Sequence, residues 1–274
     1  MKKMFKFLLV AAMMLAVSEA GAQAIARHGS DDFRIGIAGY TFRKFDTDST
    51  LKMYQIAGVK YMSVKNFHLP LNSTTEQMDA FKKKCAQYGV ECYAVGPINM
   101  KTAKDVDEAF DYAVRFGATL MIAIPAYDLL PQVERKVKET GIRVAIHTHG
   151  PTQSIWEDCE TAMKYIGKLD NRIGICIDLG HTFRYGKNPA KDLVTYKDRI
   201  FDIHIKDITL PTKEGKDVPM GRGGMDYKAI VEALRKTGYK GVCSLEYERD
   251  PEAPFFGVLE SIGYFRGVCD GTAR

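Results

Sequence analysis

Four short runs of this sequence end in side chains that can bind a metal ion or move a proton. Each run follows an apolar stretch and contains imidazole, carboxylate or ammonium groups, and the runs are 145–149, 178–181, 204–207 and 245–248. Nitrogen and carboxylate ligands together suit a divalent cation, and an apolar setting would not otherwise tolerate so many polar groups. We therefore expect one divalent metal ion, with manganese or zinc as the first choice and cobalt or magnesium as alternatives.

The elements that carry these runs follow one another at a regular spacing. His147, Asp178, His204 and Glu246 are 31, 26 and 42 residues apart, which fits successive strand–helix units with one long loop at 209–225. From residue 33 onward, short apolar runs alternate with amphipathic stretches. The expected strands are 34–39, 61–65, 91–95, 119–124, 143–147, 173–178, 200–206 and 242–246, and helical periodicity is clearest at 75–88, 103–116, 155–169 and 227–237.

Eight such units predict the α/β class and a single (β/α)8 TIM barrel. An open, doubly wound sheet is the alternative fold, but no Gly-x-Gly-x-x-Gly turn follows the first strand. Because a barrel strand turns every second residue inward, the seventh strand should point Asp202, His204 and Lys206 into the barrel and Phe201 toward the helices. Strand ends of a barrel meet at one mouth, so we expect the four runs to form one site.

Composition and the first residues set the class of protein. With 46% hydrophobic and 27% charged residues in 274, the chain reads as an ordinary globular protein, so collagen-like, disordered and coiled-coil classes are excluded. Residues 1–22 combine lysines, an apolar run and small residues before Gln23, which predicts a signal peptide, with an uncleaved anchor as the alternative. The mature barrel domain, 23–274, is then exported, periplasmic or secreted, with no membrane association after cleavage.

Charge and cysteines refine the expected partners and redox state. Removal of the net +2 of residues 1–22 leaves +3 of the formal +5, without a Lys/Arg stripe, so we expect no nucleic-acid partner. The six cysteines show no metal-type Cys-x-x-Cys spacing, and Cys92, Cys176 and Cys243 fall in apolar runs. This favours free buried thiols, with Cys85 and Cys92 left open as a pair.

Several of these motifs carry a family resemblance. Cys-Ile-Asp-Leu-Gly-His at 176–181, Asp-Ile-His-Ile-Lys-Asp at 202–207, the segment 218–227 and Ser-Leu-Glu at 244–246 resemble the xylose-isomerase-like TIM barrel superfamily. That group includes sugar phosphate isomerases and epimerases, inosose and dehydroshikimate dehydratases, and endonuclease IV. The resemblance implies a small-molecule carbohydrate or keto-sugar as the partner. It also implies Asp178, His204 and Glu246 as metal ligands and His181 and Lys206 in the substrate pocket, and it leaves a homodimer open.

One departure from the family pattern narrows the resemblance, and one class within the family is excluded. Members similar to the ketose 3-epimerases carry Glu at the end of the fifth strand, where this chain has His147. Neutral imidazole binds the same cations, so His147 can complete a site of two imidazoles and two carboxylates. An endonuclease IV-like trinuclear zinc site would need further His ligands, and the third strand region, 93–99, contains none.

Isomerisation, epimerisation and β-elimination share one step, the abstraction of a proton α to a carbonyl with a metal-stabilised enediolate. We expect the metal on His147, Asp178, His204 and Glu246. The catalytic groups would be Glu246 or His149 as general base and Lys206 or His181 as acid or electrophile. Asp207 is expected to orient His181 or Lys206, and Glu248 to point to solvent. Substrate-binding residues would be His68, Phe67, Phe42 and Tyr40, which follow the first two strands.

Three functions remain compatible with these residues. The first is a divalent-metal-dependent sugar isomerase or epimerase. The second is an exported metal-dependent 3-keto-glycoside lyase, which eliminates the aglycone; phosphorylated sugars are scarce outside the cytoplasm, so the export signal favours it, as does the replacement at His147. The third is a non-catalytic sugar-binding barrel, against which the complete ligand set argues.

Overall fold

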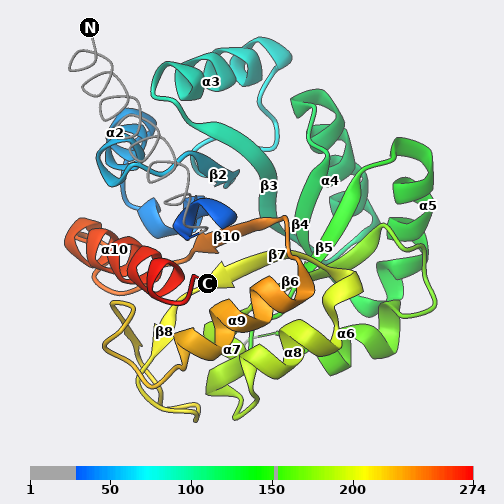
Figure 1. Cartoon of the computed structure of the whole chain (residues 1–274). Coiled ribbons are helices and arrows are strands. Elements are labelled where there is room, and N and C mark those ends of the chain that lie inside the picture. The colour runs from blue at the N-terminus through cyan, green and yellow to red at the C-terminus, as the bar shows by residue number, and fades with distance from the viewer. Residues whose placement is uncertain (1–28, 151–153, 274) are drawn as a thin grey trace, which may run out of the picture.

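A computed structural model describes residues 29–150 and 154–273 of the chain, and the expected signal peptide, 1–22, lies outside the described residues. Eight parallel strands close into a barrel in the order β1-β10-β7-β6-β5-β4-β3-β2, with helices around them (Figure 1). The prediction of a single (β/α)8 TIM barrel is confirmed. The strands are β1 Arg34–Ala38, β2 Tyr61–Val64, β3 Glu91–Met100, β4 Leu120–Pro125, β5 Arg143–His147, β6 Ile173–Asp178, β7 Ile200–Ile205 and β10 Val242–Leu245.

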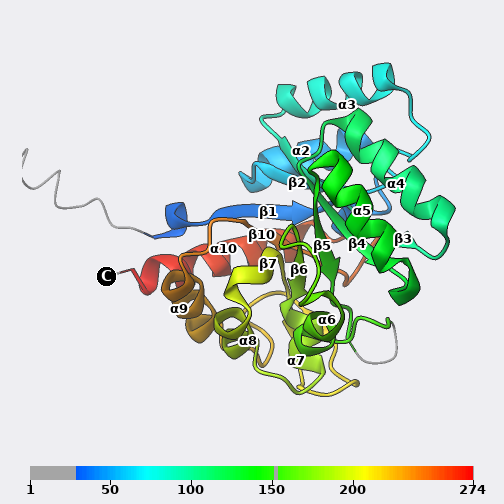
Figure 2. The same ribbon diagram turned by 90° about the vertical axis from the view of Figure 1, so that its right-hand side faces the viewer.

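Along the chain the helices alternate with the strands, and in space they surround the barrel (Figure 2). They are α2 Thr47–Ala57, α3 Thr75–Gln87, α4 Ala103–Phe116, α5 Leu130–Thr140, α6 Cys159–Ile166, α7 Leu179–Arg184, α8 Pro189–Thr195, α9 Tyr227–Thr237 and α10 Phe255–Gly271. Short 3-10 helices precede β1, at Ser30–Asp32, or lie between a strand and a helix, at Gly39–Phe42, Tyr127–Leu129 and Lys197–Arg199. None of the helices in the described ranges is long and apolar enough to cross a membrane.

Capping residues decide where these helices begin. Thr102 forms a capping box with Asp105 at the start of α4, where helical periodicity also predicts the first turn. The predicted helix 155–169 is shorter in the structure, because the Asp158 side chain accepts a hydrogen bond from the Thr161 amide and sets the start of α6 at Cys159. The position of the N-cap residue, rather than the extent of the apolar pattern, therefore decides where α6 begins.

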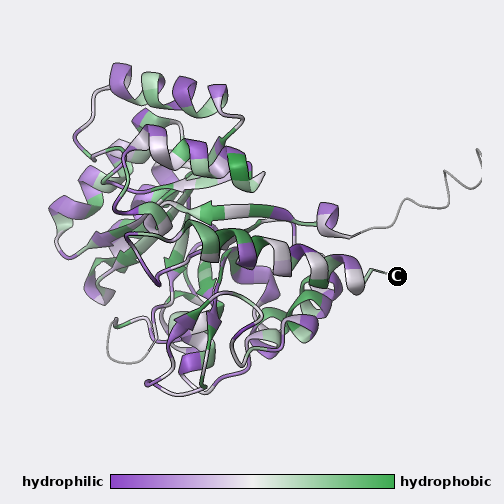
Figure 3. Cartoon of the chain, turned by 90° about the vertical axis from the view of Figure 1, so that its left-hand side faces the viewer, coloured by the Kyte–Doolittle hydropathy of each residue, from purple (hydrophilic) through white to green (hydrophobic). Residues whose placement is uncertain are grey.

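Two apolar layers build the barrel. The larger one lies between the strands and the apolar sides of the helices, whose polar sides face outward (Figure 3). The smaller one fills the inside of the barrel near the amino ends of the strands, and we call it the floor cluster. It consists of Ala94, Leu120, Ile122, Ala145, Cys176 and Phe201. All six side chains are buried.

Phe201 corrects one prediction from strand alternation. The register between β6 and β7 shifts, since Ile175 pairs with Ile200 while Cys176 pairs with Asp202. This irregularity places Phe201 inside the barrel rather than against the helices, and its ring occupies the space over Gly174, where a Cβ would lie 2.5 Å from the ring. Ile203 and Ile205 do face the helices, as the alternation predicts.

The long loop after β7 forms a small hairpin of β8, Asp207–Ile208, and β9, Asp217–Val218. The Asp207 carboxylate accepts hydrogen bonds from the amides of Gly221 and Gly223 at 2.9 and 3.0 Å. A Cβ on Gly223 would lie 2.1 Å from this carboxylate, so only glycine fits there. The expectation that Asp207 orients His181 or Lys206 is therefore wrong, because its oxygens hold the loop in place.

All six cysteines lie within the described ranges and are free thiols, so Cys85 and Cys92 form no disulfide in the structure. Five of the six are buried.

Candidate active site

The four predicted metal ligands meet at the mouth of the barrel. His147 and Asp178 end β5 and β6, His204 lies near the end of β7, and Glu246 follows β10 directly. One ligand atom from each side chain lies within 4.8 Å of the others, and all four residues are buried. We call this set the metal quartet. Parallel strands that end at the same level explain why residues so far apart in the sequence meet.

Distances within the quartet match what a divalent cation requires. His147 Nε2 lies 3.0 Å from His204 Nδ1, and Glu246 Oε2 lies 3.3 Å from the same nitrogen. Asp178 Oδ2 is 3.9 Å from the His147 nitrogen and 4.0 Å from the His204 nitrogen. Ligand atoms about 2.1 Å from a tetrahedral zinc ion lie about 3.4 Å from one another. The observed separations bracket that value.

Unused hydrogen-bonding capacity supports the same fit. Asp178 Oδ1 accepts the His181 amide at 2.8 Å and caps α7, whereas Oδ2 makes no hydrogen bond in the described structure and has the Lys206 ammonium 3.1 Å away as an ion-pair partner. The N-cap of α7 and the metal quartet thus use different oxygens of the Asp178 carboxylate. A buried carboxylate oxygen that makes no hydrogen bond keeps lone pairs with which it can bind a cation. The residues present therefore fit a divalent cation.

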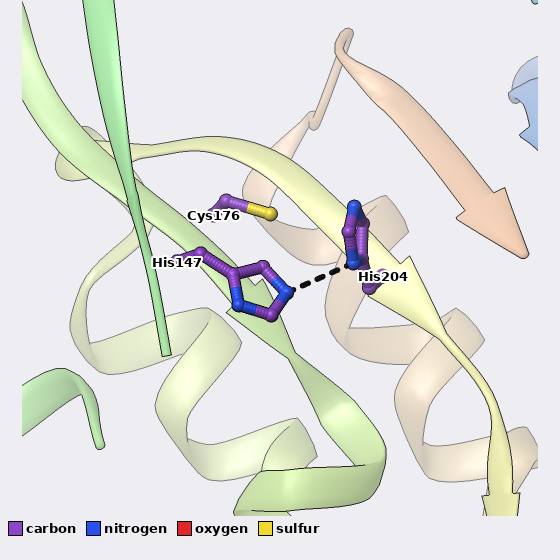
Figure 4. Close-up of side chains that lie close together, drawn as sticks. All are labelled: His147, Cys176 and His204. Atoms are coloured by element: carbon purple, nitrogen blue, oxygen red, sulfur yellow. Dashed lines mark hydrogen bonds between the residues drawn. The ribbon is translucent and has the colours of Figure 1, made fainter. Parts of the chain in front are cut away.

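Cys176 offers a competing ligand set with the same two imidazoles (Figure 4). Its sulfur lies in the floor cluster and donates to Asp202 Oδ2 at 3.5 Å. Burial, together with the Asp202 carboxylate, raises the pKa of this thiol well above its usual value. Because thiolate rather than thiol binds metals, the set with Asp178 and Glu246 fits a cation better.

Opposed charges set the protonation of the quartet. Burial lowers the pKa of His147 well below its usual value, and the nearby His204 acts in the same direction. Burial also lowers the pKa of His204, but the carboxylates of Glu246, Asp202 and Asp178 outweigh it, so the net shift is upward. Asp202 lies below the quartet, 3.7 Å from His204 Nε2, and both of its oxygens accept from the Tyr93 hydroxyl at 3.1 Å.

Lys206 places a fixed positive charge beside the quartet. Its Nζ lies 3.1 Å from Asp178 Oδ2, 3.0 Å from Glu246 Oε2 and 2.6 Å from Glu248 Oε1. Burial lowers the pKa of Lys206, but these carboxylates outweigh it and hold the pKa well above its usual value. Glu248 therefore faces the site, with its side chain 27% exposed, which corrects the expectation that it points to solvent.

Two cavities open at this mouth and share His149 and Glu248 in their walls. The ligand cavity, of about 490 Å³, is also lined by His147 and Glu246 of the quartet. The loop cavity, of about 560 Å³, is lined by His181 and by residues of the β8–β9 hairpin. A quartet in the wall of a cavity of this size can meet a small-molecule substrate.

The predicted substrate-binding residues separate into two groups. Tyr40 lines the ligand cavity, and the 42% exposed Phe67 lies beside it, with ring centroids 6.1 Å apart. Phe42 is fully buried and packs against Tyr54, so the predicted sugar contact is wrong for this residue.

His68 is the second misplaced residue, because it also lies in the protein interior. Its Nε2 lies 3.3 Å from both the Thr50 hydroxyl and the Phe42 carbonyl, and burial lowers its pKa. It lines neither of the two cavities at the mouth.

Lys65 and Asn99 line the ligand cavity and were missed by sequence reasoning. The ammonium group of Lys65 donates to the Pro97 carbonyl, and burial lowers its pKa. Alternation could have found Lys65, which follows β2 two residues after the buried Ser63. Asn99 was hidden because β3 continues to Met100, five residues beyond the predicted strand end.

Comparisons with known proteins agree with this architecture. The rhizopine catabolism protein MocC of Rhizobium meliloti is 31% identical over 138 residues, which cover 44% of this chain and 42% of that protein. Inosose dehydratase of Lacticaseibacillus casei is 26% identical over 152 residues, which cover 49% of this chain and 51% of the enzyme. The chain thus matches these curated relatives over about half of their length.

A solved structure extends the likeness to the whole barrel. The crystal structure of IOLI protein with a binding zinc atom superposes with a TM-score of 0.73 at 16% identity, covering 88% of this chain and 99% of that one. At this identity the likeness concerns the fold. The family model of the xylose isomerase-like TIM barrel matches residues 51–267. With its closed eight-stranded barrel, the chain belongs to the xylose isomerase-like TIM barrel family.

Proposed function

We propose that this protein is a divalent-metal-dependent enzyme that abstracts a proton α to the carbonyl of a sugar, as an isomerase or epimerase does. The metal quartet in the wall of the ligand cavity carries the proposal. His147, Asp178, His204 and Glu246 would hold the cation. When bound, it would act as a Lewis acid that stabilises negative charge on the substrate oxygens.

The side chains around the quartet divide the remaining tasks. Glu246 is held by His204 at 3.3 Å and Lys206 at 3.0 Å, so it serves as a ligand rather than as a mobile base. We assign proton abstraction to His149, which lines both cavities, with its Nδ1 unpartnered among the described residues. Lys206, which keeps its proton, supplies positive charge near the developing oxyanion.

A lyase is the second candidate, and one observation favours it. Epimerisation requires proton exchange on two faces of one carbon, whereas the fifth strand offers His147 to the quartet instead of a second opposed carboxylate. Abstraction on one face followed by loss of a leaving group, as in β-elimination, needs a single base. The similarity to inosose dehydratase points the same way. An exported 3-keto-glycoside lyase is the form of this reaction that we propose.

Proton NMR in deuterated buffer tests both candidates. The mature chain, supplied with manganese or zinc, is incubated with ketoses and with 3-keto-glycosides, and Glu246→Gln is the inactive control. Deuterium next to the carbonyl of a ketose establishes an isomerase or epimerase, and release of the aglycone establishes a lyase. Tight sugar binding without either reaction would overturn both and favour a sugar-binding barrel.

A further inference from the structure

We infer that Arg184 is a positioning residue, which fixes His181 in the tautomer that carries its proton on Nε2. His181 lies in the first turns of α7 and lines the loop cavity, with a side chain almost fully buried. Arg184 Nη1 lies 3.3 Å from His181 Nδ1. The contribution of this arrangement to turnover rests on the proposed function, whereas the tautomer itself does not.

The chemistry of the guanidinium decides the tautomer. All nitrogens of an arginine side chain donate and none accepts, so a ring nitrogen that faces it must hold a lone pair. Nδ1 of His181 is therefore the acceptor. The proton of the neutral ring must then sit on Nε2, because one nitrogen of neutral imidazole donates and the other accepts.

The surroundings leave Nε2 as the nitrogen that can meet a ligand. Gly150 packs against the Nδ1 edge of the His181 ring, so closely that a Cβ added to this glycine would lie 3.0 Å from Nδ1. Nε2 is buried and has no hydrogen-bond partner among the described residues. A buried N–H without a protein partner is the donor that a substrate oxygen or a water molecule would satisfy. Arg184 thereby makes His181 a hydrogen-bond donor toward the substrate rather than a base.

A second contact holds Arg184 in position. Its Nη2 lies 3.0 Å from Asp217 Oδ2 in β9, and its side chain is only 13% exposed. Since α7 and the hairpin are thus joined through one guanidinium, the hairpin helps to set the orientation of His181. An Arg in this place has two separable tasks: the ion pair with Asp217 and the hydrogen bond to His181.

The experiment separates those tasks by exchanging the charges. The double variant R184E/D217R keeps an ion pair between α7 and β9 but places a carboxylate, which accepts, opposite Nδ1. The tautomer is read from the nitrogen resonances of His181 in the full chain saturated with zinc, and turnover is measured beside it. Arg249→Met is the matched control, because Arg249 lines the same cavity and pairs with Asp250 at 3.2 Å.

Wild-type protein and Arg249→Met should both show the proton on Nε2. The charge-exchange variant should show it on Nδ1, with wild-type thermal stability and a fall in kcat of at least about tenfold, in the range that a misplaced acid–base group costs. Arg184→Lys, which keeps a donor, should retain the wild-type tautomer. A proton on Nδ1 in the wild type, or on Nε2 in the charge-exchange variant, would overturn the inference. Absent turnover in the wild type would count against the proposed function alone, since the resonances are read without substrate.

Discussion

The two ends of the barrel interior are built from the same strands but from opposite kinds of residue. On β6, Cys176 belongs to the apolar floor cluster, and Asp178, two residues later, belongs to the metal quartet. Two residues of a strand span only about 6.6 Å. On β7 the same change runs from Phe201 to His204. The interior of the barrel therefore changes from packed apolar side chains to a cluster of charged groups within two or three residues along a strand.

This difference assigns stability to one end and chemistry to the other. The floor cluster excludes water and contributes through burial and packing, as barrel interiors do near the amino ends of their strands. The mouth gathers the carboxylates of Asp178, Glu246 and Glu248 around one ammonium group, that of Lys206. Such a cluster stabilises the fold little and is retained where a ligand or a reaction needs it. Substitutions at the two ends should therefore separate activity from stability.

Glu246→Gln at the mouth should have the largest effect. The loss of one ligand should lower kcat/KM at least about a thousandfold, or about 4 kcal/mol, since a Lewis acid supplies several kcal/mol of transition-state stabilisation. The free energy of unfolding of the metal-free protein should change by less than about 1 kcal/mol, because Lys206 keeps Asp178 and Glu248 as partners. Isothermal titration with zinc, activity assays and urea unfolding measure these effects. If Glu246→Gln bound zinc with near-wild-type affinity, Glu246 would not be a metal ligand.

Ile122→Ala in the floor cluster should show the reverse pattern. This fully buried side chain leaves a cavity when shortened, which should cost about 3 kcal/mol of unfolding free energy. The zinc affinity and kcat of the folded protein should stay within about twofold, because the quartet is built from other strands. Ile56→Ala in α2 is the control, because Ile56 is 55% exposed, and it should change stability by less than about 0.5 kcal/mol. A large loss of zinc affinity in Ile122→Ala would show that the two ends are coupled.

Sequence periodicity predicts the barrel and the quartet well for a physical reason. Strand alternation encodes which side of a strand is buried, and the ends of β5 and β6 fall at the predicted residues, His147 and Asp178. Parallel closure then brings strand ends together without further information. The four ligands could thus be placed in one site from spacing and residue type.

Features that depend on tertiary packing escaped this reasoning. Phe201 lies inside because the β6–β7 register shifts, and β3 continues past Gly96, where a Cβ would lie 2.1 Å from the Ile122 carbonyl. Alternation assumes regular strands, so it fails at such irregularities. The positions of Glu248 and Phe42 depend on how the chain turns after a strand ends, which local patterns do not encode.

Cys176→Ser tests the border between the two ends. If the quartet holds the metal, zinc affinity should stay within about twofold, and the added polarity in the floor cluster should cost about 1 kcal/mol of unfolding free energy. Titration with zinc and urea unfolding are the two measurements. Cys243→Ser is the comparison, because Cys243 is a buried thiol that belongs neither to the floor cluster nor to the metal quartet. A fall in zinc affinity of more than about a hundredfold would instead favour the set of His147, Cys176 and His204.

Asp192→Asn should have the smallest effect and contrasts a carboxylate outside the barrel with those at the mouth. Burial and the nearby Asp158 raise the pKa of Asp192 to about 6, whereas Lys206 and His204 overcome burial and lower that of Glu246 well below its usual value. Because the folded pKa of Asp192 exceeds its unfolded value of 3.8, the stability that its protonated form contributes is complete below pH 3.8 and is lost as the pH rises through about 6. The neutral amide escapes this loss, so Asp192→Asn should gain up to about 1 kcal/mol at pH 7.5, after allowance for solvent screening, and nothing at pH 4. Urea unfolding at both pH values measures the gain, and equal gains at both would show that packing rather than ionisation is responsible.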